Sequence, residues 1–264
     1  MRRLAFVFIF LHFVAALPLG AEEIRLEGNF VQGGLVFGTT LPDNAVFLDG
    51  RALRLSFDGV FVFGFGRDAG PDAILQVIKR DGTEALRKLT IAKRDYDIQR
   101  IDGLPTNMVT PPEEVLKRIR EEVIRVSTAR AFDMVGSFFK ETFIWPAEGQ
   151  ISGVYGSQRI LNGKPRRPHF GIDIAAPTGT PVVAPAGGEI RLVEPDLYFS
   201  GGTIILDHGH GVSSSFLHMS RIDVTEGERV VQGEVIGAVG ATGRVTGAHL
   251  DWRMNWFERR VDPA

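Results

Sequence analysis

The chain has 264 residues, of which 44% are hydrophobic and 23% charged, a composition that suits one large or two modest globular domains and argues against global disorder. Its formal net charge of −2 provides no basic surface of the kind that nucleic acid requires, so we expect no nucleic-acid partner. The sequence contains no cysteine, which excludes disulfides, thiolate metal sites and a lipid anchor on cysteine.

Residues 1–21 have the pattern of a secretory signal peptide. Two arginines precede an apolar run from Leu4 to Ala16, and the small residue Ala21 ends the segment. The run is shorter than the roughly 20 residues that cross a bilayer, so we favour cleavage after Ala21 over an uncleaved anchor. The signal predicts export to the periplasm or cell envelope, with no stable membrane anchor after cleavage.

Residues 22–104 are predicted to form a small, immunoglobulin-like β-sandwich. Runs rich in β-forming residues alternate with Asp-Gly pairs at 49–50, 58–59 and 81–82, which are strong hairpin signals. Several short strands in so short a segment favour a sandwich. No histidine cluster or paired-carboxylate motif occurs here, so we expect a spacer or docking module.

Residues 105–142 are predicted to form a linker that contains one amphipathic helix over 111–135. Thr110 and Glu113 have the spacing of a capping box, and Pro111 suits the first helical position. Apolar residues recur at helical spacing at Val115, Ile119, Val123 and Val126. We expect the helix to pack against one or both domains; the alternative is a docking surface for a protein partner.

Residues 143–264 are predicted to form an antiparallel β domain. Runs 203–206 and 212–218 flank a glycine-rich turn over 207–211 and predict a hairpin. A second hairpin is predicted over 230–239. His208 and His210 lie in the first turn, and we interpret both as structural residues.

Three further histidines and two aspartates of this domain have the residue types of a hydrolytic metal site. On a strand, His249 and Asp251 point to the same side. His169 and Asp173 are too far apart on a regular strand to share one ion, and neighbouring prolines oppose a helix. We expect a bend with positive φ at Gly171 to bring them together.

A fifth residue, His218, closes a predicted strand on whose face Ser214 and Phe216 also lie. Alone, it would be interpreted as a packed structural histidine. Because the other four residues occur in the same domain, we expect His218 to belong to the same site. The side chains of Arg159, Tyr198 and Arg244 are candidates for lining a substrate groove.

Four segments of this domain resemble the lysostaphin-type (LytM-like) zinc metallopeptidases of bacterial cell walls. They are WPAEGQISGVYGSQR, HFGIDIAAPTGTPVVAPAGGEI, GGTIILDHGHGVSSSFLHMS and VVQGEVIGAVGATGRVTGAHL, in the family's order within residues 145–250. The resemblance implies that His169, Asp173 and residue 251 bind zinc and that His218 and His249 act in catalysis. It implies hydrolysis of a peptide bond in the peptidoglycan cross-link.

The sequence departs from that family at Asp251, which stands where the family has its third ligand histidine, and at Ala248, which replaces a common proline. Asp is an accepted zinc ligand, but its negative charge should weaken the Lewis acid and let harder ions such as Mn²⁺ compete. We therefore expect a zinc endopeptidase in which other divalent ions can substitute, and Asp251→His is expected to preserve or strengthen metal binding.

Two other functions stay open at this point. One is a catalytically impaired LytM-like domain that binds murein or activates an amidase. In the other, the N-terminal sandwich is the main functional unit and binds glycan or a protein partner.

Overall fold

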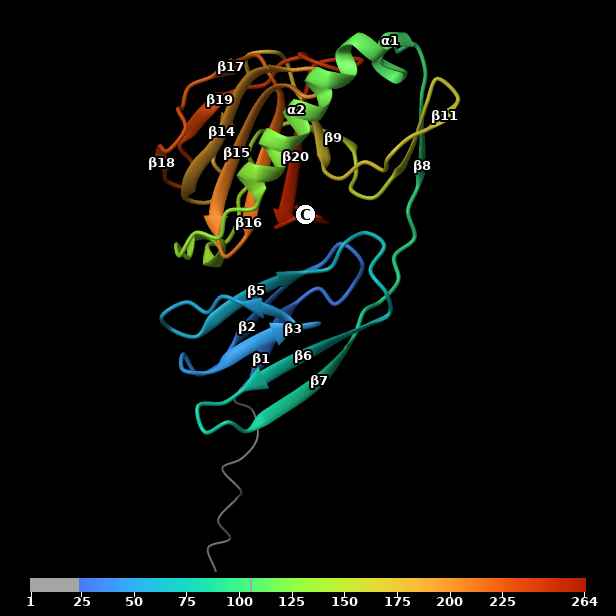
Figure 1. The fold of residues 1–264 in the computed structure, drawn as a ribbon. Helices are drawn as coiled ribbons and strands as arrows, with labels where there is room; N and C mark the ends of the chain where they lie inside the picture. Colours follow the sequence, from blue (N-terminus) through green and yellow to red (C-terminus); the bar gives the residue numbers. More distant parts are fainter. Residues whose placement is uncertain (1–23, 105) are drawn as a thin grey trace, which may run out of the picture.

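The computed structural model describes residues 24–104 and 106–264. The expected signal peptide, residues 1–21, lies outside the described residues. Figure 1 shows two β-rich bodies connected by a long extended segment, with helix α2 lying along the C-terminal body. The predicted fold class is confirmed: the chain is mainly β, with a small N-terminal sandwich, a linking helix and a C-terminal antiparallel domain.

The N-terminal body is a sandwich of two antiparallel sheets, and apolar side chains of both, such as Val36 and Leu75, are fully buried. The predicted Asp-Gly turns at 49–50 and 81–82 join strands, the first through positive φ at both residues. The sheets have the orders β1-β2-β5 and β4-β3-β6-β7. The bounds are β1 Arg25–Gly28, β2 Leu35–Thr39, β3 Ala45–Leu48, β4 Arg51–Leu53, β5 Val60–Gly64, β6 Asp72–Ile78 and β7 Glu84–Thr90.

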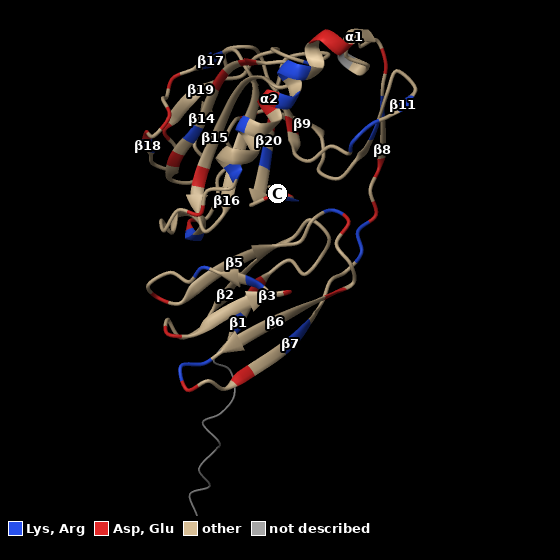
Figure 2. Cartoon of the chain, viewed as in Figure 1, with Lys and Arg blue, Asp and Glu red and all other residues tan. Residues whose placement is uncertain are grey.

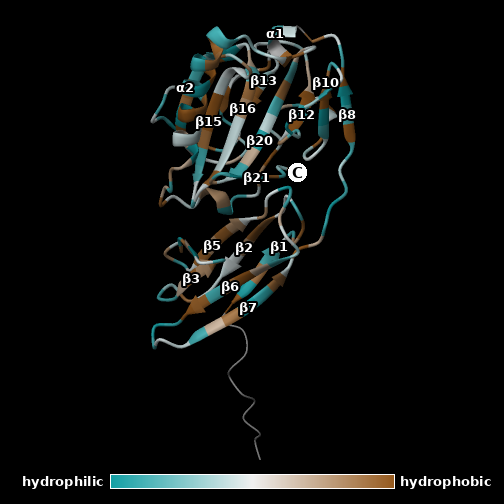
Figure 3. Ribbon diagram, turned by 45° about the vertical axis from the view of Figure 1, so that its right-hand side comes forward, coloured by the Kyte–Doolittle hydropathy of each residue, from teal (hydrophilic) through white to brown (hydrophobic). Residues whose placement is uncertain are grey.

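The C-terminal body is built on one eight-stranded sheet with the order β18-β14-β15-β16-β20-β12-β9, in which β21 pairs with β20. A second sheet has the order β13-β19-β17. The bounds are β9 Gln150–Gly153, β12 Ile172–Ala175, β13 Pro181–Val183, β14 Gly188–Leu197, β15 Gly201–Gly209, β16 Val212–Met219, β17 Arg221–Ile222, β18 Arg229–Val230, β19 Val235–Ala238, β20 His249–Trp256 and β21 Arg259–Val261. Figure 3 shows hydrophobic residues along strands of both bodies.

The extended segment between the bodies joins the C-terminal one. Strand β8 (Ile98–Ile101) pairs in parallel with β10 (Gln158–Leu161), which also pairs with β11 (Lys164–Pro165). Residues 98–101, within the range predicted for the sandwich, therefore contribute a strand beside the C-terminal domain. A short helix, α1 (Thr106–Val109), follows.

The linking helix is shorter than predicted. Helix α2 spans Glu113–Arg130, and its N-cap is Pro112, without a side-chain capping bond. The capping box expected at Thr110 is wrong, because that hydroxyl instead accepts a hydrogen bond from Lys164 Nζ at 3.1 Å. Val123, expected on the buried stripe, is 59% exposed.

The packed face of α2 carries Val126 and Ala129, which contact Leu192 and Ile205 of the large sheet. Glu122 is buried on the same helix because it accepts hydrogen bonds from Arg118 and from the backbone of β14–β15. The apolar period therefore predicted the helix and the inward position of Val126 but not the burial of Glu122 in place of Val123. A carboxylate whose hydrogen bonds are satisfied can occupy a position that the pattern assigns to an apolar side chain.

One of the two predicted C-terminal hairpins forms. Strands β15 and β16 meet at a tight turn, where His210 and Gly211 have φ of 52° and 77°. Strand β15 extends to Gly209, so most of the predicted turn over 207–211 is strand. The hairpin over 230–239 is wrong, because β18 pairs with β14 and β19 with β13 and β17.

The two bodies share one hydrophobic core. Phe139, fully buried in the 3-10 helix η1 (Phe138–Lys140), stacks on Phe37 of the sandwich with ring centroids 6.3 Å apart. The same ring lies 4.5 Å from the His210 ring of the C-terminal body. Among the described residues, neither helix combines the length and apolarity that crossing a membrane requires.

We predict that Phe139→Ala destabilises both bodies together. Removing a buried aromatic ring should cost about 3–5 kcal/mol, and because the core is shared, one cooperative transition should shift in chemical denaturation. Phe57→Ala is the control: Phe57 is 96% exposed, so its loss should change stability by less than about 0.5 kcal/mol. Independent unfolding of the sandwich in the Phe139 variant would contradict the shared core.

Candidate metal centre

Three of the predicted site residues converge. His169 Nε2 lies 3.0 Å from Asp173 Oδ1 and 3.4 Å from Asp251 Oδ1. One ligand atom from each residue lies within 4.8 Å of the others, and all three residues are buried. The structure therefore brings together the three side chains that the sequence analysis assigned to a metal.

The pairing of β12 with β20 sets this geometry. Asp173 lies directly opposite Asp251 in the ladder, so both carboxylates project from the same face of the sheet. His169 lies in the segment before β12, where its backbone N–H donates to Ser157 and its carbonyl accepts from Gly156. Those bonds hold the imidazole above the two carboxylates.

Gly171 is needed at the bend for a reason other than the predicted one. Its φ is not positive, so the expected left-handed bend is wrong. A Cβ at this position would lie 2.5 Å from Arg253 Cγ and 2.6 Å from Asp251 Oδ1. The glycine is there because the chain passes directly against β20.

The donor atoms fit a bound cation. Both ring nitrogens of His169 and Oδ1 of Asp173 are buried without a hydrogen-bond partner among the described residues. Leaving buried polar atoms unsatisfied is costly, and imidazole with carboxylate is a ligand set that divalent metals accept. The cluster therefore has the composition and the unmet bonding capacity of a metal site.

Each carboxylate is also held by an arginine. Arg159 Nη2 donates to Asp173 Oδ2 at 2.6 Å, which leaves Oδ1 facing His169. Arg253 Nη2 donates to Asp251 Oδ2 at 2.5 Å, and its Nε donates to Oδ1 at 2.9 Å. Both oxygens of Asp251 therefore share their charge with one guanidinium.

Arg253 is not among the residues predicted from the sequence, and Arg159 is predicted only to line a groove. The signal for Arg253 was its period of two from His249 and Asp251, which places it on the same face of one strand. No comparable signal links Arg159 to Asp173, because they meet only after β10 and β12 have been placed.

The charges of the cluster shift its protonation equilibria. Burial lowers the pKa of His169, but Asp251 and Asp173 outweigh burial, and the net pKa is raised. Burial raises the pKa of Asp251, but Arg253 and His169 outweigh that effect, and the net pKa is well below its usual value. A metal must displace the proton that the aspartates favour on His169, so its binding should strengthen as pH rises.

The two histidines assigned to catalysis lie together beside the cluster. The rings of His218 and His249 are 4.9 Å apart, and His249 Nε2 is 3.7 Å from Asp173 Oδ1. His218 Nδ1 lies 2.8 Å from the carbonyl of Thr242, which requires Nδ1–H as donor and leaves Nε2 as the acceptor. Burial lowers the pKa of His218 to about 4.

His218 reaches this face through an unusual backbone conformation. Phe216 pairs with Trp252 in the core, and strict alternation would place His218 on the same core-facing side. Its φ of 66° turns the chain into the left-handed region and breaks the alternation. The expectation that His218 shares the face of Ser214 and Phe216 is therefore wrong.

The remaining candidates contact groups outside the metal cluster, although burial and the nearby charges of Arg159 and Arg253 lower the pKa of Arg244 to about 10. His208 is buried, with Nδ1 2.8 Å from the Gly187 carbonyl and Nε2 2.9 Å from the Ser214 hydroxyl, so its contacts are those of a structural residue. Tyr198 donates its hydroxyl to the Asn107 carbonyl. The guanidinium of Arg244 lies over the Phe199 ring at 4.4 Å.

These residues lie in a part of the chain that resembles known peptidases. The model of peptidase family M23 matches residues 167–263. A solved M23 peptidase structure from Pseudomonas aeruginosa is 31% identical, with a TM-score of 0.69 over 89% of this chain and 93% of that one.

Two curated relatives match the C-terminal part. Cell division protein DipM of Caulobacter vibrioides is 32% identical over 162 residues, which are 59% of this chain and 25% of DipM. Peptidoglycan DD-endopeptidase ShyA of Vibrio cholerae is 39% identical over 87 residues, which are 33% of this chain and 20% of ShyA. The chain therefore spans a quarter or less of the length of these relatives.

We predict that Gly171→Ala weakens the site and the fold together. The new methyl group has to displace Arg253 or the backbone of β20, which should cost about 1–3 kcal/mol in unfolding free energy. Zinc affinity, measured by competition with a chromophoric chelator, should fall as well. Gly70→Ala, where a Cβ meets nothing within 4 Å, is the control; equal behaviour of the two variants would contradict the close approach at Gly171.

Proposed function

We propose that this chain, which belongs to peptidase family M23, is an exported, metal-dependent endopeptidase that hydrolyses peptide cross-links of peptidoglycan. One observation carries the proposal. His169 and Asp173 turn unsatisfied buried atoms toward one point, and Asp251 has an oxygen within reach of it. The names of relatives such as ShyA support the substrate class.

His169, Asp173 and Asp251 would hold the ion. A divalent ion bound there polarises a scissile carbonyl and makes water easier to deprotonate. Zinc suits the imidazole and carboxylates, and two carboxylates also suit harder ions such as Mn²⁺. Arg159 and Arg253 fix the carboxylates from outside, as partners of metal ligands commonly do.

The two neighbouring histidines are assigned different tasks. With a pKa of about 4, His218 is neutral between pH 5 and 8, so its Nε2 accepts a hydrogen bond more readily than it takes up a proton. We assign His218 to orienting the attacking water. His249, which is 17% exposed at its side chain and adjacent to Asp173, is assigned to proton transfer.

One observation favours the competing, non-enzymatic class. Arg253 donates to both oxygens of Asp251, and this contact competes with a metal for the same lone pairs. A domain in which the arginine prevails would bind murein or activate an amidase without hydrolysing it. The two functions differ in whether purified protein retains a metal and releases peptides.

We expect the purified protein to hold about one divalent ion per chain by elemental analysis and to release soluble fragments from purified sacculi. A chelator should abolish release and added Zn²⁺ should restore it. Asp173→Asn should lower metal affinity by about 10–100-fold, whereas Asp68→Asn, which changes a carboxylate that is 75% exposed, should have no effect. Sacculus binding without an ion and without release would establish the non-enzymatic alternative.

The structure adds a condition to the expected effect of Asp251→His. That change removes the carboxylate that pairs with the mostly buried guanidinium of Arg253, and breaking such a pair from one side costs about 3–5 kcal/mol. The double variant Asp251→His with Arg253→Gln should recover stability and bind zinc at least as tightly as the wild type. Denaturation and zinc titration test this, and full stability of the single variant would contradict the pairing.

A further inference from the structure

Three arginines from three different elements gather on the face of the large sheet that carries the metal cluster. Arg253 lies on β20, Arg260 on β21 and Arg130 at the end of α2. Ser215 lies opposite Arg253, and Asn255 opposite Arg260. Arg130 donates to the Ser215 hydroxyl at 3.3 Å, and Arg260 to the Asn255 side-chain oxygen at 2.9 Å. We call Arg130, Arg253 and Arg260 the arginine cluster.

The arginine cluster is not neutralised by its contacts. Arg253 pairs with Asp251, whereas the hydrogen bonds of Arg130 and Arg260 go to neutral groups. Nε of Arg130 and Oγ of Ser213 are buried and have no hydrogen-bond partner among the described residues. Burial and the nearby Arg253 charge lower the pKa of Arg130 to about 9, which leaves it cationic at neutral pH. Partly buried cations without counter-charge are costly and favour an added anion.

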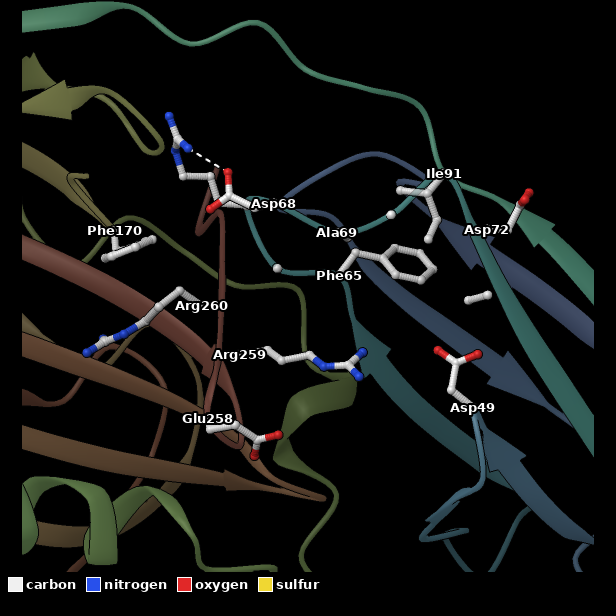
Figure 4. Close-up of a pocket in the computed structure, with 14 residues that line it drawn as sticks. Asp49, Phe65, Asp68, Ala69, Asp72, Ile91, Phe170, Glu258, Arg259 and Arg260 are labelled. Carbon is white, nitrogen blue, oxygen red and sulfur yellow. Dashed lines mark hydrogen bonds and ion pairs between the residues drawn. The ribbon is translucent and has the colours of Figure 1, made fainter. Parts of the chain in front are cut away.

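The cluster can be reached from outside. The Arg253 side chain is 21% exposed. Arg130 and Arg260 are also partly exposed. A separate cavity of about 460 Å³ between the two bodies borders Arg260 but is lined by four carboxylates and by no residue of the metal cluster, and the Arg260 side chain extends away from its Asp49 and Asp72 side (Figure 4). Basic positions on both α2 and β20 are visible in Figure 2. A ligand that reached the exposed part of Arg253 would meet the arginine cluster and the metal cluster on one face of the large sheet.

We infer that the arginine cluster is a subsite for a free carboxylate of the peptide substrate. A guanidinium binds a carboxylate through two parallel hydrogen bonds, and Arg130 and Arg260 have donors to offer. Arg253 lies two residues along β20 from Asp251, a distance of about 6–7 Å. The carboxylate that is recognised therefore belongs to a residue next to the cleaved bond or one beyond it.

This inference rests on the proposed function and makes it more specific. The substrate class is stem peptides of peptidoglycan that keep a free carboxylate near the cleaved bond. Peptides in which that carboxylate is amidated lack the anion and leave the arginines unpaired. They should therefore bind less well, because discrimination is strong when buried polar groups of a site lose their partner.

The test is a binding measurement with two fluorescent stem peptides that differ only in whether their carboxylates are free or amidated. We expect wild-type protein to bind the free form at least tenfold more tightly, by fluorescence anisotropy. Arg260→Gln and Arg130→Gln should each reduce that preference by at least fivefold, with little change for the amidated form. Arg229→Gln, at a side chain that is 77% exposed on β18, should retain the full preference.

The measurement is made with and without a chelator, because a carboxylate could also bind a metal directly. A preference that survives metal removal and is lost in Arg260→Gln supports the subsite. A preference that disappears with the metal, or that persists in both variants when their melting temperatures are unchanged, overturns it. Arg260→Lys keeps the charge without the paired donors and should recover part of the preference.

Hydrolysis of sacculi separates this inference from the proposed function. Release of fragments without any carboxylate preference refutes the subsite and leaves the hydrolase intact. A carboxylate preference in a protein that releases nothing refutes the hydrolase and leaves the subsite as part of a murein-binding module.

Discussion

The central constraint on this molecule is the repulsion between two aspartates that face each other across neighbouring strands. Asp173 and Asp251 are direct ladder partners, and like charges in that position are destabilising, the more so when buried. The surrounding side chains compensate from three directions: Arg159 on one carboxylate, Arg253 on the other and His169 between them. A cation bound between Asp173 Oδ1 and Asp251 Oδ1 would offset the same repulsion directly.

Elements far from the site in sequence bring arginines to its surroundings. Arg159 comes from β10, which is paired with the linker strand β8, so a segment far from the site in sequence supports a site carboxylate. Arg130 reaches the same face from the end of α2, which packs on β14 and β15 through Val126 and Ala129. The linker is therefore part of the site's electrostatic surroundings as well as a tether.

The sequence was sufficient for the fold class, because β-forming runs and Asp-Gly turns are local signals. Period two on a strand placed His249 and Asp251 on one side, whereas the complete set of five polar residues followed from the resemblance to a family. The backbone conformations at Gly171 and His218 could not be predicted from local signals. The close approach of Gly171 to β20 and the positive φ of His218 at a strand end both depend on tertiary packing. The predicted capping box failed for the same reason. Lys164, more than 50 residues away in the chain, takes the Thr110 hydroxyl.

Arg253 changes the charge that Asp251 contributes to a metal site. Considered alone, Asp251 adds a negative charge where a histidine would be neutral, and a metal in the site would become a weaker Lewis acid. Paired with Arg253 at 2.5 Å, the aspartate belongs to a unit with no net charge, as a neutral imidazole has none. Asp173 is paired with Arg159 in the same way, so a neutral His169 and the two aspartate–arginine pairs together carry no net charge. Asp251 and Arg253 should therefore be considered together as the replacement for a ligand histidine. Asp251 is a weaker metal ligand because its oxygens also accept hydrogen bonds from Arg253, and not because it adds charge.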